Sequence, residues 1–379
     1  MLINRTGNKS CRSEKLAKLR GRNPSGRHSF KNLPSHRQRG SALILAMLVA
    51  AWVAIMAVNM AEDFRVDSRL AEGRSLQAKI KSYLHGTESL VSGVLWADYL
   101  RDSSAEGSQV DHLAEDWALA STTLPTDIGF VRVQLTDAQG KFNINSLQRL
   151  NDNYYDSALS VTDRLTAEQK LFIRLLKLVQ PEMNDNQGLQ MVEAIVDWLD
   201  EDDRVSGQGG AESLYYLSQP VSRRPANRAI GDISELLMVR HMTPEMLAAL
   251  RPYLAALPSV TPININTAVP LVLQAINSDD TLQPASASHR LTLLKAREEA
   301  PYTSVAEALN RAGFQGVTDT AAALSVNSHY FAAQVDIQAD QQQRHANLLF
   351  YRNDNGVSVI RKDHSQFCCR TTEAARNPS

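Results

Sequence analysis

The sequence predicts an α+β fold in which a long N-terminal helix and a small antiparallel sheet flank a large inserted all-α domain. First, no proline occurs between Pro34 and Pro125, which leaves room for one helix of roughly 60 residues. Second, apolar and polar residues alternate near residue 130 and strand patterns return after residue 329. Third, residues 151–315 between these strands carry helical patterns and no strand-rich stretch. The 379 residues suffice for one or two domains beyond an N-terminal leader and anchor.

Charge divides the chain sharply at Gly40. Residues 1–40 carry 11 Lys and Arg against the single acid Glu14, whereas the remainder carries 29 basic and 40 acidic residues. A basic segment can bind nucleic acid, but directly before an apolar run it more often marks the cytoplasmic side of a membrane. The acidic remainder argues against a phosphate-binding surface, so we expect no nucleic-acid partner.

Residues 41–61, SALILAMLVAAWVAIMAVNMA, contain no charged side chain. Three interpretations are open: a retained membrane anchor, a cleaved signal peptide and a buried core helix. At about 1.5 Å per residue the segment spans roughly 30 Å, the thickness of a bilayer core, whereas signal peptides have about 7–15 apolar residues. The length therefore favours a single-pass anchor, with residues 1–40 in the cytoplasm and residue 62 onward outside.

The helical pattern continues beyond the apolar run. From Glu62 onward, apolar residues recur at roughly helical spacing and charged residues fill the gaps. They include Phe64, Leu70, Leu76, Ile80, Tyr83, Leu84, Leu90, Val94, Leu95 and Tyr99. We therefore expect one helix whose first third lies in lipid and whose remainder lies along a folded domain.

The stretch GFVRVQLTDAQGKFNIN, residues 129–145, predicts a β-hairpin. Its first strand covers the alternating residues 130–135, and Asp137–Gly140 reads as the turn. A short second strand is expected at residues 141–144.

Residues 151–315 contain several helix start signals. Thr166 with Gln169 forms a capping-box pattern ahead of LFIRLLKLV, and Asp232 with Glu235 precedes ISELLMV. Pro244 after Thr243 suits the first position of a helix. Further helices are expected at 188–199, 267–276, 287–299 and 304–312.

Three strands are expected near the C-terminus, at 329–339, 345–353 and 356–362, with a turn at Asn353–Gly356. Together with the earlier hairpin they predict a single sheet interrupted by the helical segment. The predicted organisation is a basic leader at 1–40, a transmembrane start at 41–61, a first part of the sheet domain at 62–150, the inserted helical domain at 151–315, returning strands at 316–365 and a tail at 366–379.

The most concentrated chemistry lies in residues 196–216, VDWLDEDDRVSGQGGAESLYY. Carboxylates this dense repel one another unless they are solvated or share a cation, and Ca²⁺ prefers carboxylate and carbonyl oxygens on a flexible loop. The spacing is not that of an EF-hand. From the residues alone, a solvated acidic helix end and a metal site both remain open. The candidate ligands are Asp197, Asp200, Asp202, Asp203 and Glu212.

Other function classes have little support. The sequence contains no G-x-S-x-G, H-E-x-x-H or phosphate-loop motif, so we expect no enzyme. The stretch PININTA at 262–268 resembles the start of a DNA-binding helix-hairpin-helix unit, but no glycine-rich hairpin follows. We therefore interpret Asn264 and Asn266 as structural turn and cap residues.

Four stretches carry a resemblance to a known family: the basic leader ending in SHRQRG, FNIN, IVDWLDEDD with GAESLYY, and PININTA. The leader resembles the prepilin signal of type IV pilins and type II secretion pseudopilins. Over residues 35–365 the chain resembles the minor pseudopilin K family of type II secretion systems, whose pilin fold carries a large helical insertion. That family characteristically lacks the Glu that most pilins carry at the fifth mature position, and Leu45 occupies that position here.

The resemblance implies that a prepilin peptidase cuts between Gly40 and Ser41. It implies a non-enzymatic subunit at the tip of the pseudopilus, with minor pseudopilins I and J as partners and contact with secreted substrates. The protein would lie in the bacterial inner membrane, with its bulk in the periplasm, before it joins the pseudopilus. It also implies a calcium site in the helical domain. The alternative function is a membrane-anchored periplasmic binding protein or enzyme unrelated to secretion.

Overall fold

The computed structural model describes residues 41–104, 109–119, 121–314, 317–339 and 342–365. The chain divides after Leu70 into two compact units, Met1–Leu70 and Ala71–Ser379, which we describe separately. The predicted leader and C-terminal tail lie outside the described residues. The predicted domain boundaries inside the second unit remain predictions.

Helix α1, Ser41–Ser104, confirms the predicted long helix with 64 continuous residues. Its beginning, within the first unit, is long and apolar enough to cross a membrane, and none of that window is buried. Large apolar residues there are exposed, for example Leu45, which is 65% exposed. This exposure is what a lipid-facing segment requires, and it disfavours the buried core helix.

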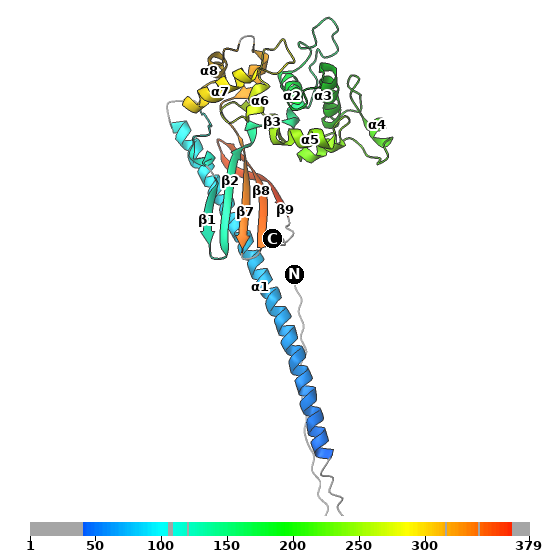
Figure 1. The fold of residues 1–379 in the computed structure, drawn as a ribbon, viewed down its shortest axis with the longest axis vertical. Helices are drawn as coiled ribbons and strands as arrows, with labels where there is room; N and C mark the ends of the chain where they lie inside the picture. The colour runs from blue at the N-terminus through cyan, green and yellow to red at the C-terminus, as the bar shows by residue number, and fades with distance from the viewer. Residues whose placement is uncertain (1–40, 105–108, 120, 315–316, 340–341, 366–379) are drawn as a thin grey trace, which may run out of the picture. The chain divides into compact units, whose positions relative to one another are not determined.

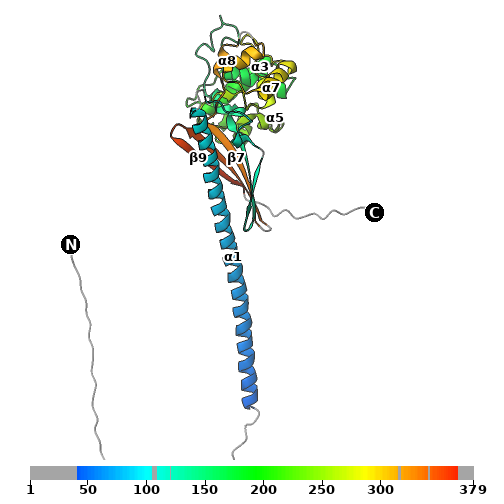
Figure 2. The same ribbon diagram turned by 90° about the vertical axis from the view of Figure 1, so that its left-hand side faces the viewer.

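In the second unit, α1 packs along one face of a sheet (Figures 1 and 2). Ile80, Val91 and Leu95 are buried against sheet residues such as Val131 and Phe331. The helical spacing of these residues is the reason that one side of α1 is covered.

The sheet is antiparallel throughout, in the order β1-β2-β7-β8-β9. Strands β2 and β7 are neighbours although the whole helical segment lies between them in the sequence, and Asp137 pairs with Phe331. The prediction of one sheet interrupted by an insertion is therefore confirmed. The strands are β1 Thr122–Thr126, β2 Gly129–Asp137, β7 Tyr330–Ala339, β8 Gln342–Asn353 and β9 Gly356–Ser365.

The predicted hairpin partner was wrong. Strand β2 pairs with the preceding β1, whereas β3, Phe142–Asn143, pairs in parallel with β4, Leu254–Ala255. The predicted turn is a 3-10 helix, η2 Ala138–Gly140, capped by the Asp137 side chain. A Cβ on Gly140 would lie 2.7 Å from the carbonyl oxygen of Thr267. The backbone at Gly140 therefore lies directly against the backbone of the helical segment. The sequence TTLPT of β1 lacks alternation and contains a proline, which hid this edge strand.

The helical segment confirms most predicted starts. Helix α2 begins after the Thr166–Gln169 capping box, and Thr243 caps α5 with Pro244 at its start. Asp232 and Glu235 form a capping box on a 3-10 helix instead of an α-helix. Before β1 lies η1, Asp116–Ala118. The helices between β2 and β7, besides η2, are η3 Ile144–Leu147, α2 Ala167–Val179, α3 Asp185–Leu199, α4 Ser213–Leu217, η4 Ile233–Met238, α5 Pro244–Leu250, η5 Arg251–Tyr253, α6 Pro270–Gln274, α7 Ala287–Glu299, α8 Val305–Arg311 and α9 Asp319–Ala322.

Helix α6 is shorter than predicted because the PININTA stretch adopts a different structure. Ile263–Asn264 form β5, which pairs in parallel with β6, Leu324–Ser325. The Asn264 amide donates to the Asp137 carboxylate at 3.1 Å, and the Asn266 amide donates to the carbonyl oxygen of Tyr302 at 3.0 Å. Both asparagines are buried structural residues in this arrangement.

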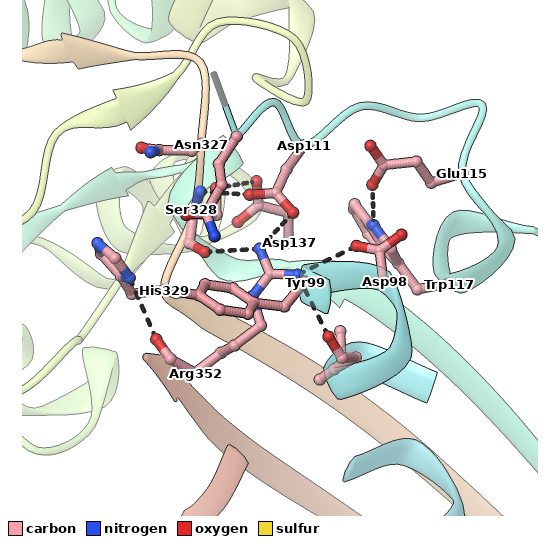
Figure 3. A network of polar contacts seen from close by, with 12 residues as sticks. Asp98, Tyr99, Asp111, Glu115, Trp117, Asp137, Asn327, Ser328, His329 and Arg352 are labelled. Atoms are coloured by element: carbon pink, nitrogen blue, oxygen red, sulfur yellow. Dashed lines mark hydrogen bonds and ion pairs between the residues drawn. The ribbon is translucent and has the colours of Figure 1, made fainter. Parts of the chain in front are cut away.

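A buried arginine, Arg352 of β8, joins α1 to the sheet (Figure 3). Its Nη1 donates to Oδ2 of Asp98 on α1 at 3.1 Å, and its Nη2 bonds to Asp111 and to the carbonyl oxygen of Ser328. The guanidinium group lies 4.5 Å from the ring centroid of Phe331. A single cation therefore connects the helix, the strand and the chain segment between α1 and β1.

Candidate metal centre

Three of the predicted acidic residues meet where α3 ends and α4 begins. Asp197 lies in the last turn of α3, Asp200 is the residue after its end, and Glu212 directly precedes α4. Each offers a carboxylate oxygen within 4.8 Å of the oxygens that the other two offer. The loop between the helices leads the chain back to α3. Glu212 therefore lies next to Asp197 and Asp200, which precede the loop in the sequence.

Asp197 and Glu212 are buried and Asp200 is half-buried, and oxygens of Asp200 and Glu212 lack a hydrogen-bond partner. Asp197 is 0% exposed and Glu212 is 2% exposed. Both carboxylate oxygens of Glu212, and Oδ1 of Asp200, are buried without a hydrogen-bond partner among the described residues. A buried charged oxygen without a donor costs free energy comparable to a lost hydrogen bond or more, so this arrangement requires compensation.

The electrostatics of the cluster indicate the same deficit. Burial, followed by the charges of Asp197 and Asp200, raises the pKa of Glu212 to about 8. Burial, followed by the charges of Asp202 and Asp197, raises the pKa of Asp200 to about 6. The carboxylates thus resist ionising together, and a bound cation would reverse that preference.

Asp197 also shapes the loop. Both of its oxygens accept the backbone N–H of Ser206 at 3.1 Å. A Cβ on Gly210 would overlap the Asp197 carboxylate, so glycine is required where the loop passes the site. The Gly-rich stretch between the acidic residues is therefore what allows the backbone to approach them.

Asp202 and Asp203 are not part of this cluster. Both are exposed, and their Oδ1 atoms accept the backbone N–H groups of Arg204 at 2.8 Å and Ser213 at 3.1 Å. Asp203 thereby satisfies the first amide of α4, and Glu212 makes no capping bond. Their charges still contribute to the raised pKa of Glu212.

The residues present fit a hard divalent cation. Ca²⁺ takes six to eight oxygen ligands, including carboxylates and backbone carbonyls, and tolerates irregular geometry. Asp197, Asp200 and Glu212 supply three carboxylates, two of which carry oxygens that lack any donor. Residues 201–211 of the loop include no Cys or His, which suits calcium better than a soft metal.

A second group of acids, Asp98, Asp111 and Glu115, is equally compact but already occupied. Arg352 bonds to both aspartates, and Glu115 accepts from the indole N–H of Trp117 (Figure 3). No local sequence pattern marks this group, because its members are spread over 18 residues and two of them bond to Arg352, which lies far along the chain.

The predicted processing site lies at the start of the described chain. Gly40 falls outside the described residues, and Ser41 is the first residue of α1. Leu45 lies within the first turns of α1 and is exposed. The predicted cleavage itself remains a prediction.

The fold and the site define a class of protein: a pilin-like subunit with an apolar helical start and an inserted helical segment that carries a carboxylate centre. Two family models, both described as type II secretion system (T2SS), protein K, match residues 140–259 and 263–327. The chain belongs to this family.

Relatives support the assignment over most of the chain. Type II secretion system protein K of Klebsiella pneumoniae is 32% identical over 338 residues, which cover 86% of this chain and 97% of the relative. The protein K of Pseudomonas aeruginosa is 29% identical over 331 residues, covering 87% and 93%. The chain is thus a pseudopilin of type II secretion, a structural subunit of a secretion system.

A solved structure shares the fold. It is the crystal structure of the GspK-GspI-GspJ complex from the enterotoxigenic Escherichia coli type 2 secretion system, with a TM-score of 0.61 and 24% identity. The match covers 78% of this chain and all of that one. It confirms the long helix, the antiparallel sheet and the helical content as one architecture.

Proposed function

We propose that this subunit forms the tip of the pseudopilus by associating with minor pseudopilins I and J. The observation that carries the proposal is Leu45, which is the fifth residue when Ser41 is counted as the first, and which is 65% exposed. A carboxylate in lipid is costly unless a positive group meets it, and a subunit above would supply its N-terminal amine. A subunit with no neighbour above it needs no such carboxylate.

The exposed side of α1 supports the choice of partners. Gly86, Ser89, Leu90, Gly93 and Ala97 recur at helical spacing, all are exposed, and none is charged. A Cβ on Gly86 or Gly93 would meet nothing within 4 Å. Small uncharged residues let a second helix approach closely, and the similar solved protein is itself in complex with GspI and GspJ.

This docking is tested with Gly86→Trp and Gly93→Trp. Because a side chain at either position enters open space, the fold should be kept while the neighbouring helix is blocked. Co-purification with I and J should fall at least tenfold, whereas Leu291→Trp, at an exposed position on α7, should leave it unchanged. Unaltered co-purification of both glycine variants would contradict this role of α1.

The proposal includes processing and location. A prepilin peptidase would cut between Gly40 and Ser41, and the apolar start of α1 would hold the subunit in the inner membrane with its bulk in the periplasm. The 11 basic residues before Ser41 support this orientation. Mass spectrometry of the mature protein should find Ser41 at the N-terminus. A cut near Ala61 or an intact leader would indicate the alternative of an ordinary signal peptide or anchor.

The proposal also includes calcium at Asp197, Asp200 and Glu212, supported by the unpartnered Glu212 oxygens. A bound cation would neutralise the crowded carboxylates and hold the α3–α4 loop to both helices, a structural role and not a catalytic one. Calorimetry of the full chain in detergent should show heat on CaCl₂ addition, and chelation should lower the melting temperature. No heat and unchanged melting would exclude this site.

A further inference from the structure

The α3–α4 loop is held from a second side by Glu193, one helical turn before Asp197 on α3. Oε2 of Glu193 accepts the backbone N–H of Gln208 at 3.0 Å and of Gly209 at 2.6 Å. Its Oε1 accepts the hydroxyl of Tyr154. Glu193 is 6% exposed and Tyr154 is 8% exposed, so these bonds form away from solvent.

The backbone of the loop is built to meet this carboxylate. Gly207 has a φ of 54°, in the left-handed region that favours glycine, and a Cβ there would overlap the Glu193 carboxylate. A Cβ on Gly209 would overlap the backbone of Gln190, one turn earlier on α3. Two glycines therefore allow the loop to lie directly on the helix, with its amides pointing at Glu193.

The carbonyl groups of the same loop are also engaged. Nη1 of Arg240 donates to the carbonyl oxygen of Gly210 at 2.8 Å, and Nε2 of His241 lies 3.2 Å from the carbonyl oxygen of Gly209. The loop is consequently fixed on its amide side by Glu193 and on its carbonyl side by residues 240 and 241. Asp197 and Glu212 take no part in these contacts.

We propose that Glu193 is a positioning residue that sets the calcium affinity of the site without binding the cation. It accepts three hydrogen bonds, from Tyr154, Gln208 and Gly209, so its oxygens are already used. By fixing residues 207–209 it determines where the chain re-enters toward Gly210 and Glu212. This inference rests on the proposed calcium site. Tyr154 supports the positioning role, because its hydroxyl donates to Glu193 and orients that carboxylate. Groups that orient metal ligands typically change affinity by about 10–100-fold when they are altered.

The test compares three variants of the full chain in detergent. Glu193→Gln removes the charge and one acceptor, and Tyr154→Phe removes the hydroxyl donor without changing any charge. Glu201→Gln is the matched control, because it removes one exposed negative charge from the same acidic run without touching the loop contacts described. Calorimetry with CaCl₂ measures affinity, and hydrogen exchange of residues 205–211 in chelator measures loop order without any cation.

Glu193→Gln should weaken calcium binding at least tenfold and speed exchange of the loop amides, with Tyr154→Phe changing both in the same direction by a smaller factor. Glu201→Gln should change the affinity no more than about threefold, the difference expected from a single screened charge. If the wild-type chain binds calcium and Glu193→Gln binds it equally well, the inference fails alone. If the wild-type chain binds no calcium, both it and the proposed site fail. Should Glu193→Gln not fold, Tyr154→Phe decides, and unchanged affinity there overturns the inference.

Discussion

Two buried groups of three acids lie in the second unit, and they differ in one component. Arg352 bonds to Asp98 and Asp111 of the group that also holds Glu115, whereas no Lys or Arg among the described residues bonds to Asp197, Asp200 or Glu212. The first group, which we call the arginine cluster, contains a cation that the chain itself supplies. The second, which we call the loop cluster, leaves three carboxylate oxygens without a donor, against one, Oδ1 of Asp98, in the arginine cluster.

The difference teaches how a structural ion-pair network is distinguished from a ligand site. Acid density alone does not separate them, because both groups hold three carboxylates within the same 4.8 Å. Raised pKa values do not separate them either, since burial raises the pKa of both Glu115 and Glu212 to about 8. The presence or absence of a resident cation separates them, and it can be tested by removing or supplying that charge.

The largest effect is expected from Arg352→Met. This change leaves Asp98 and Asp111 buried without their cation, which typically costs about 3–5 kcal/mol. Denaturant unfolding should show the loss in the free energy of unfolding. Arg132→Met, at an exposed position on β2, is the control and should change stability by less than about 0.5 kcal/mol. Equal stability of Arg352→Met and wild type would mean that the arginine cluster does not depend on its cation.

A smaller but specific effect is expected from Glu212→Gln. At a calcium concentration about one hundred times the dissociation constant, binding stabilises the wild-type chain by about 2.7 kcal/mol. The variant should lose most of this gain because one carboxylate ligand is gone. In chelator its free energy of unfolding should stay within about 1 kcal/mol of wild type. Thermal unfolding with and without calcium measures the stabilisation by calcium and the stability in chelator. If calcium stabilised the variant as much as wild type, Glu212 would not be a calcium ligand.

The pH dependence of the calcium-free protein separates the two clusters further. The pKa of Glu115 rises from 4.5 to about 8 on folding, because of burial and then the charge of Asp98. The folded state therefore keeps a proton that the unfolded chain has released, so the contribution of Glu115 to stability falls as pH rises from about 4.5 to about 8. Glu115→Gln should flatten that part of the stability profile in the presence of chelator. A profile that keeps its slope in the variant would assign the dependence to other groups.

The smallest effect is expected from Asp202→Asn and Asp203→Asn. Both residues are exposed and bond to backbone amides outside the loop cluster. Each substitution should reduce calcium affinity by only about two- to threefold, through the loss of a screened surface charge. Calorimetry measures it directly. A loss as large as that of Glu212→Gln would make these residues ligands, as the sequence predicted, and would show that the loop closes on the cation.

The elements that could be predicted from sequence are those with local signals. The capping box at Thr166, the proline at position 244 and the absence of proline before residue 125 each fix a helix through nearby residues alone. Strand β1 and the pairing of β3 with β4 depend on distant partners, so the local pattern misassigned them. The strand that pairs with β2 is determined by tertiary contacts and not by the turn residues that begin at Asp137.

The candidate site divides along the same line. Asp197, Asp200 and Glu212 were found because the acidic run and the Gly-rich loop lie close together in the sequence. Which two of the five acids would point away was not predictable, because the bonds to the amides of Arg204 and Ser213 appear only once the loop is folded. Glu193 was not singled out either, since one acid in an amphipathic helix resembles any other.

The register of β2 with β7 has a consequence for the order of assembly in the cell. Asp137 pairs with Phe331, so the centre of the sheet closes only after the residues between them have been synthesised. Closing the long loop between the two strands costs conformational entropy before the pairing contributes any stability, and contacts between residues so far apart in sequence slow folding. If the intervening helices fold first, they shorten the effective loop and bring the ends of β2 and β7 together. On this view the insertion acts as an intramolecular folding template, and the sheet is the last part of the subunit to become resistant to proteases.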